Sequence, residues 1–148
     1  MKKIALFLIA ITMLAPGCAI NRATAISAPG IDLSKTKSFY IVEESGDKGT
    51  NNIYKIIKMN LVKRGYTVTT GRDMQSPYKT DVILTYVDRW MWDMSMYMIE
   101  LKVTFIDPIN NLPMARGNSL HTSLTRLSAE EMVDEVLTNI FDSTKSNP

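Results

Sequence analysis

Apolar residues alternate with other residues between Asp81 and Asp107, and this is the most regular pattern in the chain. The alternating apolar positions form two runs: Val82, Leu84 and Tyr86, and then Tyr97, Ile99, Leu101, Val103 and Phe105. A period of two is typical of strands that bury one face. We therefore predict two long strands here, around which the rest of the chain packs.

Shorter segments on both sides extend the predicted sheet. Residues 38–43 and 66–70 are rich in β-branched and aromatic residues, which favour strands. Pro108 and two asparagines predict a turn over residues 107–111, after which residues 112–123 return as a further strand. Gly117 interrupts that strand and indicates a bulge or a close approach of another backbone.

Two helices are predicted from apolar residues at helical spacing. The first follows a cap at Thr50 or Asn51, carries Ile53, Ile57 and Leu61 on one face, and ends at Gly65, which tolerates a left-handed conformation. The second begins with the capping box Ser128-Ala-Glu-Glu131. Its apolar stripe consists of Met132, Val133, Val136, Leu137, Ile140 and Phe141.

These elements predict an α+β fold with the order β-α-β-β-β-β-α. Two amphipathic helices need a sheet face to cover, so the simplest arrangement is a single mixed, mostly antiparallel sheet of about five strands with both helices packed on one face. We assign residues 31–142 to this domain and residues 143–148 to a disordered tail. Residues 18–30 have few large apolar side chains and contain Pro29-Gly30, which predicts a flexible tether.

The N-terminal segment, residues 1–17, has the features of a signal peptide. Lys2 and Lys3 precede an apolar run that is too short to span a membrane, and Cys18 follows directly. The sequence from Leu14 to Cys18 resembles the lipobox of bacterial lipoproteins, with Ala15 where leucine is usual. This resemblance implies acylation of Cys18 and, with Ala19 next to it, an anchor in the outer membrane on its periplasmic side. An ordinary signal peptide with an incidental cysteine is the alternative.

Charge adds little once the signal peptide is set aside. Its removal takes away two of the 17 basic residues and leaves 15 basic and 15 acidic residues. A neutral domain does not favour nucleic-acid binding, which depends on clustered cations. Cys18 is the sole cysteine, so its acylation would leave no thiol for disulfide or redox chemistry.

Three further features of the mature chain carry a family resemblance. They are the opening Ile31-Asp32-Leu33-Ser34, a central strand that ends in tryptophans, and the strand-turn-strand from Phe105 to Arg116. Together they resemble small bacterial envelope lipoproteins of an uncharacterised α+β family. The resemblance implies a fold and a location, and it brings no catalytic residues and no cofactor.

Catalysis has one weak candidate. His121 shares a predicted strand with Ser119 and Ser123, with Thr122 beside them, and a hydrolase would need neighbouring elements to complete a triad. Nucleophile, phosphate-loop, zinc and dinucleotide motifs are absent from the sequence. We therefore expect a protein that is not an enzyme, with an envelope hydrolase as a minor alternative.

The most unusual cluster is Trp90, Met91, Trp92, Met94, Met96 and Met98, which contains both tryptophans. We place Met94, Met96 and Met98 on the strand face opposite the core series. Three interpretations stay open: ordinary core, a surface that binds another envelope protein or a lipid, and a thioether site for Cu(I). We favour the binding surface, and hence a binding or assembly accessory anchored to the membrane through Cys18.

Overall fold

Six strands and two α-helices make up the part of the chain that the structure describes. The structure is a computed structural model, which describes residues 21–43, 52–75 and 79–145. The elements are β1 (Asn21–Ser27), β2 (Ser38–Val42), α2 (Ile53–Lys63), β3 (Thr67–Gly71), β4 (Val82–Asp93), β5 (Ser95–Ile106), β6 (Pro113–His121), the 3₁₀ turn η1 (Ser123–Thr125) and α3 (Ala129–Lys145).

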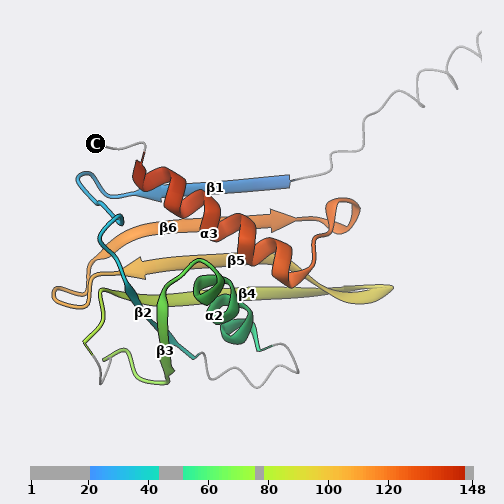
Figure 1. The fold of residues 1–148 in the computed structure, drawn as a ribbon. Helices are drawn as coiled ribbons and strands as arrows, with labels where there is room; N and C mark the ends of the chain where they lie inside the picture. Colours follow the sequence, from blue (N-terminus) through green and yellow to red (C-terminus); the bar gives the residue numbers. More distant parts are fainter. Residues whose placement is uncertain (1–20, 44–51, 76–78, 146–148) are drawn as a thin grey trace, which may run out of the picture.

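The strands form one mixed sheet with the order β1-β6-β5-β4-β2-β3 (Figure 1). The first four strands in this order pair antiparallel, whereas β2 pairs parallel with both β3 and β4. Helix α2 connects the parallel pair β2 and β3, as a crossover between parallel strands requires. The predicted α+β fold with two helices on a single sheet is confirmed, with six strands instead of about five.

Both helices cover the same face of the sheet (Figure 1). The buried side chains Ile53, Ile57 and Leu61 of α2 join the apolar stripe of α3 and one face of the strands in one core cluster. Arg64, just after α2, ties the two helices together, because its guanidinium donates to Asp134 at 2.8 Å and to Thr138 at 2.7 Å. The opposite sheet face carries no helix among the described residues.

Helix α3 begins and packs as the sequence predicts. Ser128 and Glu131 form the capping box, with Glu131 N donating to Ser128 Oγ at 3.1 Å and Ser128 N donating to Glu131 Oε2 at 2.8 Å. All six residues of its apolar stripe are buried. Gly117 lies directly beneath the helix, where an added Cβ would stand 2.7 Å from Val136 Cγ2 and 2.8 Å from Ile140 Cγ1. The predicted bulge or close backbone approach at Gly117 is therefore wrong, because side chains of α3 approach Gly117 and the β5–β6 register shift lies at Phe105 and Ile106.

The prediction of a flexible tether over residues 18–30 is wrong for most of its length. Residues 21–27 form β1, which pairs along all seven residues with β6. Its side chains are mostly exposed, because this edge strand is held in the sheet by backbone hydrogen bonds and not by an apolar face. The sequence of the segment is therefore polar, and the apolar pattern that predicts a strand is missing. The predicted tail is also shorter, since α3 continues to Lys145. Residues 18–20 and 146–148 lie outside the described part.

A β-bulge changes which face of β5 is buried. Arg89 pairs with Glu100, but Trp90 pairs with Met98, so Ile99 has no partner in the ladder. The alternation therefore shifts by one residue at this point. Leu101, Val103 and Phe105 face the core as predicted, while Tyr97 and Ile99 do not belong to the core cluster and Met98 does. The expected placement of Met98 opposite the core is wrong for this reason.

Candidate functional site

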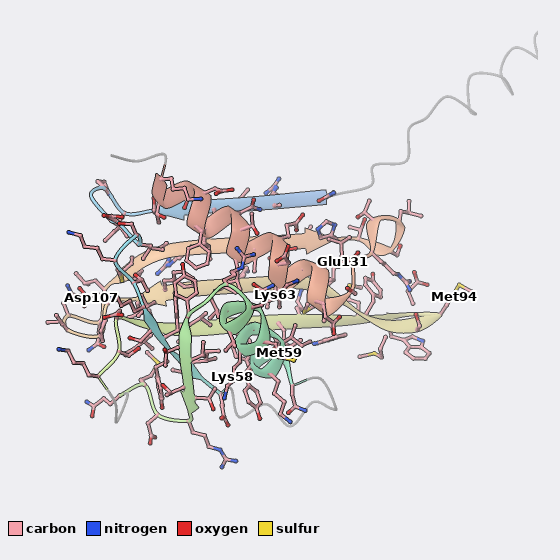
Figure 2. All side chains as sticks on the ribbon, in the orientation of Figure 1. Lys58, Met59, Lys63, Met94, Asp107 and Glu131 are labelled. Carbon is pink, nitrogen blue, oxygen red and sulfur yellow. The ribbon has the colours of Figure 1, made fainter. Side chains whose placement is uncertain are left out.

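The end of the β4–β5 hairpin carries four large apolar side chains that are exposed to solvent. Met94 is 94% exposed, Trp92 70%, Met96 56% and Met91 45%. We call these four residues the hairpin tip. Figure 2 shows Met94 at one extremity of the long hairpin and Asp107 at the opposite end of the sheet.

The hairpin turns within a single residue. Asp93 pairs with Ser95, and Met94 between them has a φ of 58°, in the left-handed region that favours glycine. Trp92 lies directly across the ladder from Met96. Since consecutive residues of a strand point to opposite faces, Met91 lies on the other face from Trp92. Apolar side chains therefore surround the tip on both faces and at its apex.

Arg126 braces this hairpin from outside the sheet. Its guanidinium donates to the carbonyl of Asp93 at 2.8 Å, to the Asp93 carboxylate at 3.1 Å and to Ser95 Oγ at 3.0 Å. It also lies 4.1 Å from the centroid of the Tyr97 ring, within the range of a cation–π contact. Arg126 follows η1, so the segment after β6 fixes the position of the hairpin tip.

Four of the six residues predicted to form a binding surface are thus brought together and exposed. The other two belong to the interior. Met98 is only 2% exposed and joins the core because of the bulge, and Trp90 is half-buried against that core, with its indole N–H donating to Asp88. The predicted surface is therefore corrected to the hairpin tip.

Burial of Met98 also weakens the copper interpretation. A Cu(I) site would use several thioether sulfurs on one accessible face, and only Met94 and Met96 of the three alternating methionines are exposed. Within residues 21–43, 52–75 and 79–145, no group of three or more His, Cys, Asp and Glu side chains is placed to hold a metal ion.

Two of the residues considered for a hydrolase, Ser119 and His121, come together in a different chemical arrangement, whereas Ser123 lies in η1 beyond the end of β6. Ser119 Oγ donates to Glu135 Oε2 at 2.6 Å, and His121 Nε2 lies 2.9 Å from the same oxygen. A nucleophile must contact its general base, whereas here serine and histidine each contact the carboxylate. His121 is 2% exposed and Ser119 is fully buried, so the cluster ties β6 to α3. Glu135 was missed from the sequence, although it flanks the apolar stripe three residues after Met132.

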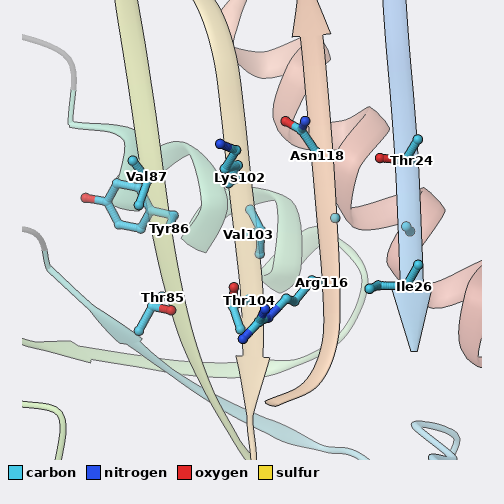
Figure 3. A pocket seen from close by; sticks show the side chains of 12 residues that line it. Thr24, Ile26, Thr85, Tyr86, Val87, Lys102, Val103, Thr104, Arg116 and Asn118 are labelled. Atoms are coloured by element: carbon cyan, nitrogen blue, oxygen red, sulfur yellow. The ribbon is translucent and has the colours of Figure 1, made fainter. Parts of the chain in front are cut away.

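The sheet face without helices contains a shallow hollow of about 370 Å³. Figure 3 shows this face with the helices behind the strands. The polar side chains around the hollow come from β1, β4, β5 and β6 and include Thr24, Thr85, Lys102, Thr104, Arg116 and Asn118. Nearby, Glu100 is buried between Arg89 at 3.6 Å and Lys102 at 3.3 Å, which neutralises its charge locally.

The predicted anchor at Cys18 lies outside the described residues. Asn21, where β1 begins, is three residues further along the chain. None of the helices that the structure describes has the length and apolar character needed to cross a bilayer.

Comparison with known proteins identifies related folds only. No protein-family model matches the sequence, and no curated protein matches it. The structure resembles a PelC dodecamer from Paraburkholderia phytofirmans, with a TM-score of 0.57, 10% identity, and coverage of 84% of this chain and 98% of that chain. A variant PelC dodecamer from the same organism gives a TM-score of 0.59 at 12% identity, covering 82% of this chain and 98% of that one. At these identities the likeness shows a shared fold.

Proposed function

We infer that this protein is a lipid-anchored binding or assembly accessory of the bacterial outer membrane, facing the periplasm, with the hairpin tip as its contact surface. The observation that carries the proposal is the exposure of Trp92, Met94 and Met96 on a turn that Arg126 holds in place. Exposed large apolar side chains cost solubility, and tryptophan and methionine are suited to contact surfaces. The lipobox-like sequence ending at Cys18 supports the anchor.

Site-specific photo-crosslinking in intact cells tests the contact surface. A photoreactive residue replaces Trp92 in one version and Ile109 in a control version. Ile109 is 91% exposed and lies in the β5–β6 turn, at the other end of the sheet from the hairpin tip. We expect a defined adduct from position 92 and none from position 109. Equal adducts at both positions, or none at either, would contradict the proposal.

The anchor requires a separate measurement. We expect labelled palmitate to be incorporated into the wild-type protein, which should then sediment with outer membranes. Cys18→Ser should abolish the label. A wild-type protein that carries no acyl chain would remove the anchor from the proposal.

A further inference from the structure

The hairpin tip and the start of β1, the strand that follows the predicted anchor along the chain, lie at the same end of the sheet (Figure 1). The strand pairing establishes this independently of the picture. Arg22 pairs with Leu120, Leu120 with Glu100, and Glu100 with Arg89, so one row of residues crosses from β1 to β4. Because β1 and β4 run in opposite directions, the chain before Arg22 and the chain after Arg89 leave this row toward the same side.

The two segments also contain the same number of residues beyond the row. Asp93, where β4 ends, is four residues after Arg89, and Cys18 is four residues before Arg22. Four residues of strand extend about 13 Å. The backbone from Cys18 to Asn21 spans at most about 11 Å, so an acyl chain on Cys18 would keep the start of β1 close to the membrane surface. A bilayer that holds this anchor lies within reach of Met94.

From this geometry we propose that the hairpin tip inserts into the interfacial region of the same membrane leaflet that holds the acylated Cys18. The proposal rests on the proposed function, because it needs the anchor, and it names lipid as the partner of the tip. Two attachments at one end of the sheet would hold the long strands upright on the membrane. The hollow on the helix-free face would then open sideways into the periplasm.

The distribution of side chains on the tip favours lipid over a protein surface. Trp92 and Met96 form a pair on one face, Met91 lies on the other face, and Met94 occupies the apex. A protein partner would be expected to cover one face of the hairpin, whereas lipid surrounds an inserted element on all sides. Tryptophan is also enriched at membrane interfaces, where its ring is buried and its N–H stays hydrated.

The charges near the tip are compatible with insertion to this depth. The carboxylate of Asp93, the acidic group of the turn, is paired with Arg126. Further back, the row that crosses the sheet contains two exposed arginines, Arg22 and Arg89, and the buried carboxylate of Glu100, which lies 3.6 Å from the Arg89 guanidinium. Cations at that level would lie near lipid phosphates, to which anionic membranes attract basic groups.

Depth-dependent quenching of tryptophan fluorescence tests the proposal. The full-length acylated protein, with Trp90→Phe so that Trp92 is the only tryptophan, is reconstituted into phosphatidylethanolamine–phosphatidylglycerol vesicles. Brominated lipids in the same vesicles then report contact between the indole and the acyl region. We expect a blue shift and loss of most of the Trp92 emission. A matched control carries Ile109→Trp in a background without the native tryptophans, and we expect no quenching by lipid there.

The outcomes separate the two proposals. If the protein is acylated and bound to vesicles but Trp92 is not quenched, insertion is wrong while the anchor stands. Equal quenching at positions 92 and 109 would also overturn insertion, because the molecule would then lie flat. If the protein carries no acyl chain, the anchor is removed from the proposed function, and the insertion fails with it because it needs the anchor.

A second measurement covers the case in which Trp90→Phe disturbs the fold. The crosslinker at position 92, in the otherwise unchanged chain, should give lipid adducts in intact cells. Adducts to another protein or to a second copy of this chain would overturn insertion and identify the true partner of the tip.

Discussion

The guanidinium of Arg126 lies 4.1 Å from the centre of the Tyr97 ring while it donates to both sides of the turn at Met94. Among the described residues, no other strand pairs with this end of the hairpin, so the contacts of Arg126 hold it in position. We expect Arg126→Ala to free the tip without unfolding the domain, because the core lies elsewhere. Amide hydrogen exchange over residues 91–97 should become faster.

Arg126→Lys is the matched variant for this prediction. Lysine keeps the positive charge but lacks the planar fork that contacts several acceptors at once. It should restore protection only in part. Unchanged exchange in Arg126→Ala would show that the hairpin holds its own conformation.

Glu135 should contribute to stability through the two groups that share its carboxylate. Glu135→Ala leaves the buried Ser119 hydroxyl and His121 imidazole without this acceptor, and we expect a loss of about 2–3 kcal/mol in the free energy of unfolding. Glu130→Ala on the exposed side of the same helix should cost about 0.5 kcal/mol. Urea denaturation measures both. Equal effects would refute the role given to the cluster.

Gly117→Ala should destabilise the fold, because the new methyl group would meet α3 at contact distances below 3 Å. Overpacking of this kind costs roughly 1–3 kcal/mol. A double-mutant cycle with Val136→Ala tests the cause, since Val136 Cγ2 is the nearest atom. The double variant should be less destabilised than the sum of the single variants, and simple additivity would contradict the proposed clash.

Asp81 links the starts of β2 and β4. Its carboxylate accepts hydrogen bonds from Lys37 N, Ser38 N and Ser38 Oγ, each at 2.9 Å, and these bonds, the one from Lys37 N above all, lower the pKa of Asp81 below its ordinary value of 3.8. A carboxylate with a lowered pKa in the folded state stabilises that state above pH 3.8, and this contribution is lost as the pH falls through the lowered pKa.

Asp81→Asn should therefore reduce the free energy of unfolding at neutral pH, by on the order of 1 kcal/mol because the site is exposed to solvent. The difference from wild type should shrink as the pH falls below about 4, because Asp81 is protonated first in the unfolded chain and then, at its lowered pKa, in the folded protein. Urea denaturation as a function of pH measures this. A difference that stays constant down to pH 2 would exclude the charge as its source.

Those parts of the fold that depend on local pattern could be predicted from the sequence. The stripe from Met132 to Phe141 and the capping box at Ser128 determine α3, and alternation determines most of β4 and β5. Strand β1 could not be recognised, because an edge strand held by backbone pairing needs no apolar face. The bulge at Ile99 has no sequence signal of its own, and it reversed the predicted environment of Met98.

The residue types of the candidate site could be predicted from the sequence, but which of those residues are exposed could not. The cluster of tryptophan and methionine residues indicated the hairpin as the candidate site. In the structure, Met98 is buried and Trp90 is half-buried, so neither belongs to the exposed surface. The roles of Arg126 and Glu135 depend on contacts across 31 and 16 residues of sequence, respectively. Contacts of that range follow from the packing of β6 and α3, and periodicity does not report them.

Strand β1 has a mechanical consequence. All seven of its residues pair antiparallel with β6, and it begins three residues after the cysteine predicted to hold the lipid. A pull on the chain before Asn21, along the strand, loads the whole ladder in shear, because the hydrogen bonds lie across the direction of force. Under force along the strand, β1 separates from β6 only when many hydrogen bonds break together. Under force perpendicular to the strand, the bonds would break one at a time. An edge strand with little apolar burial can therefore transmit force from the anchored chain to the whole domain without detaching from the sheet.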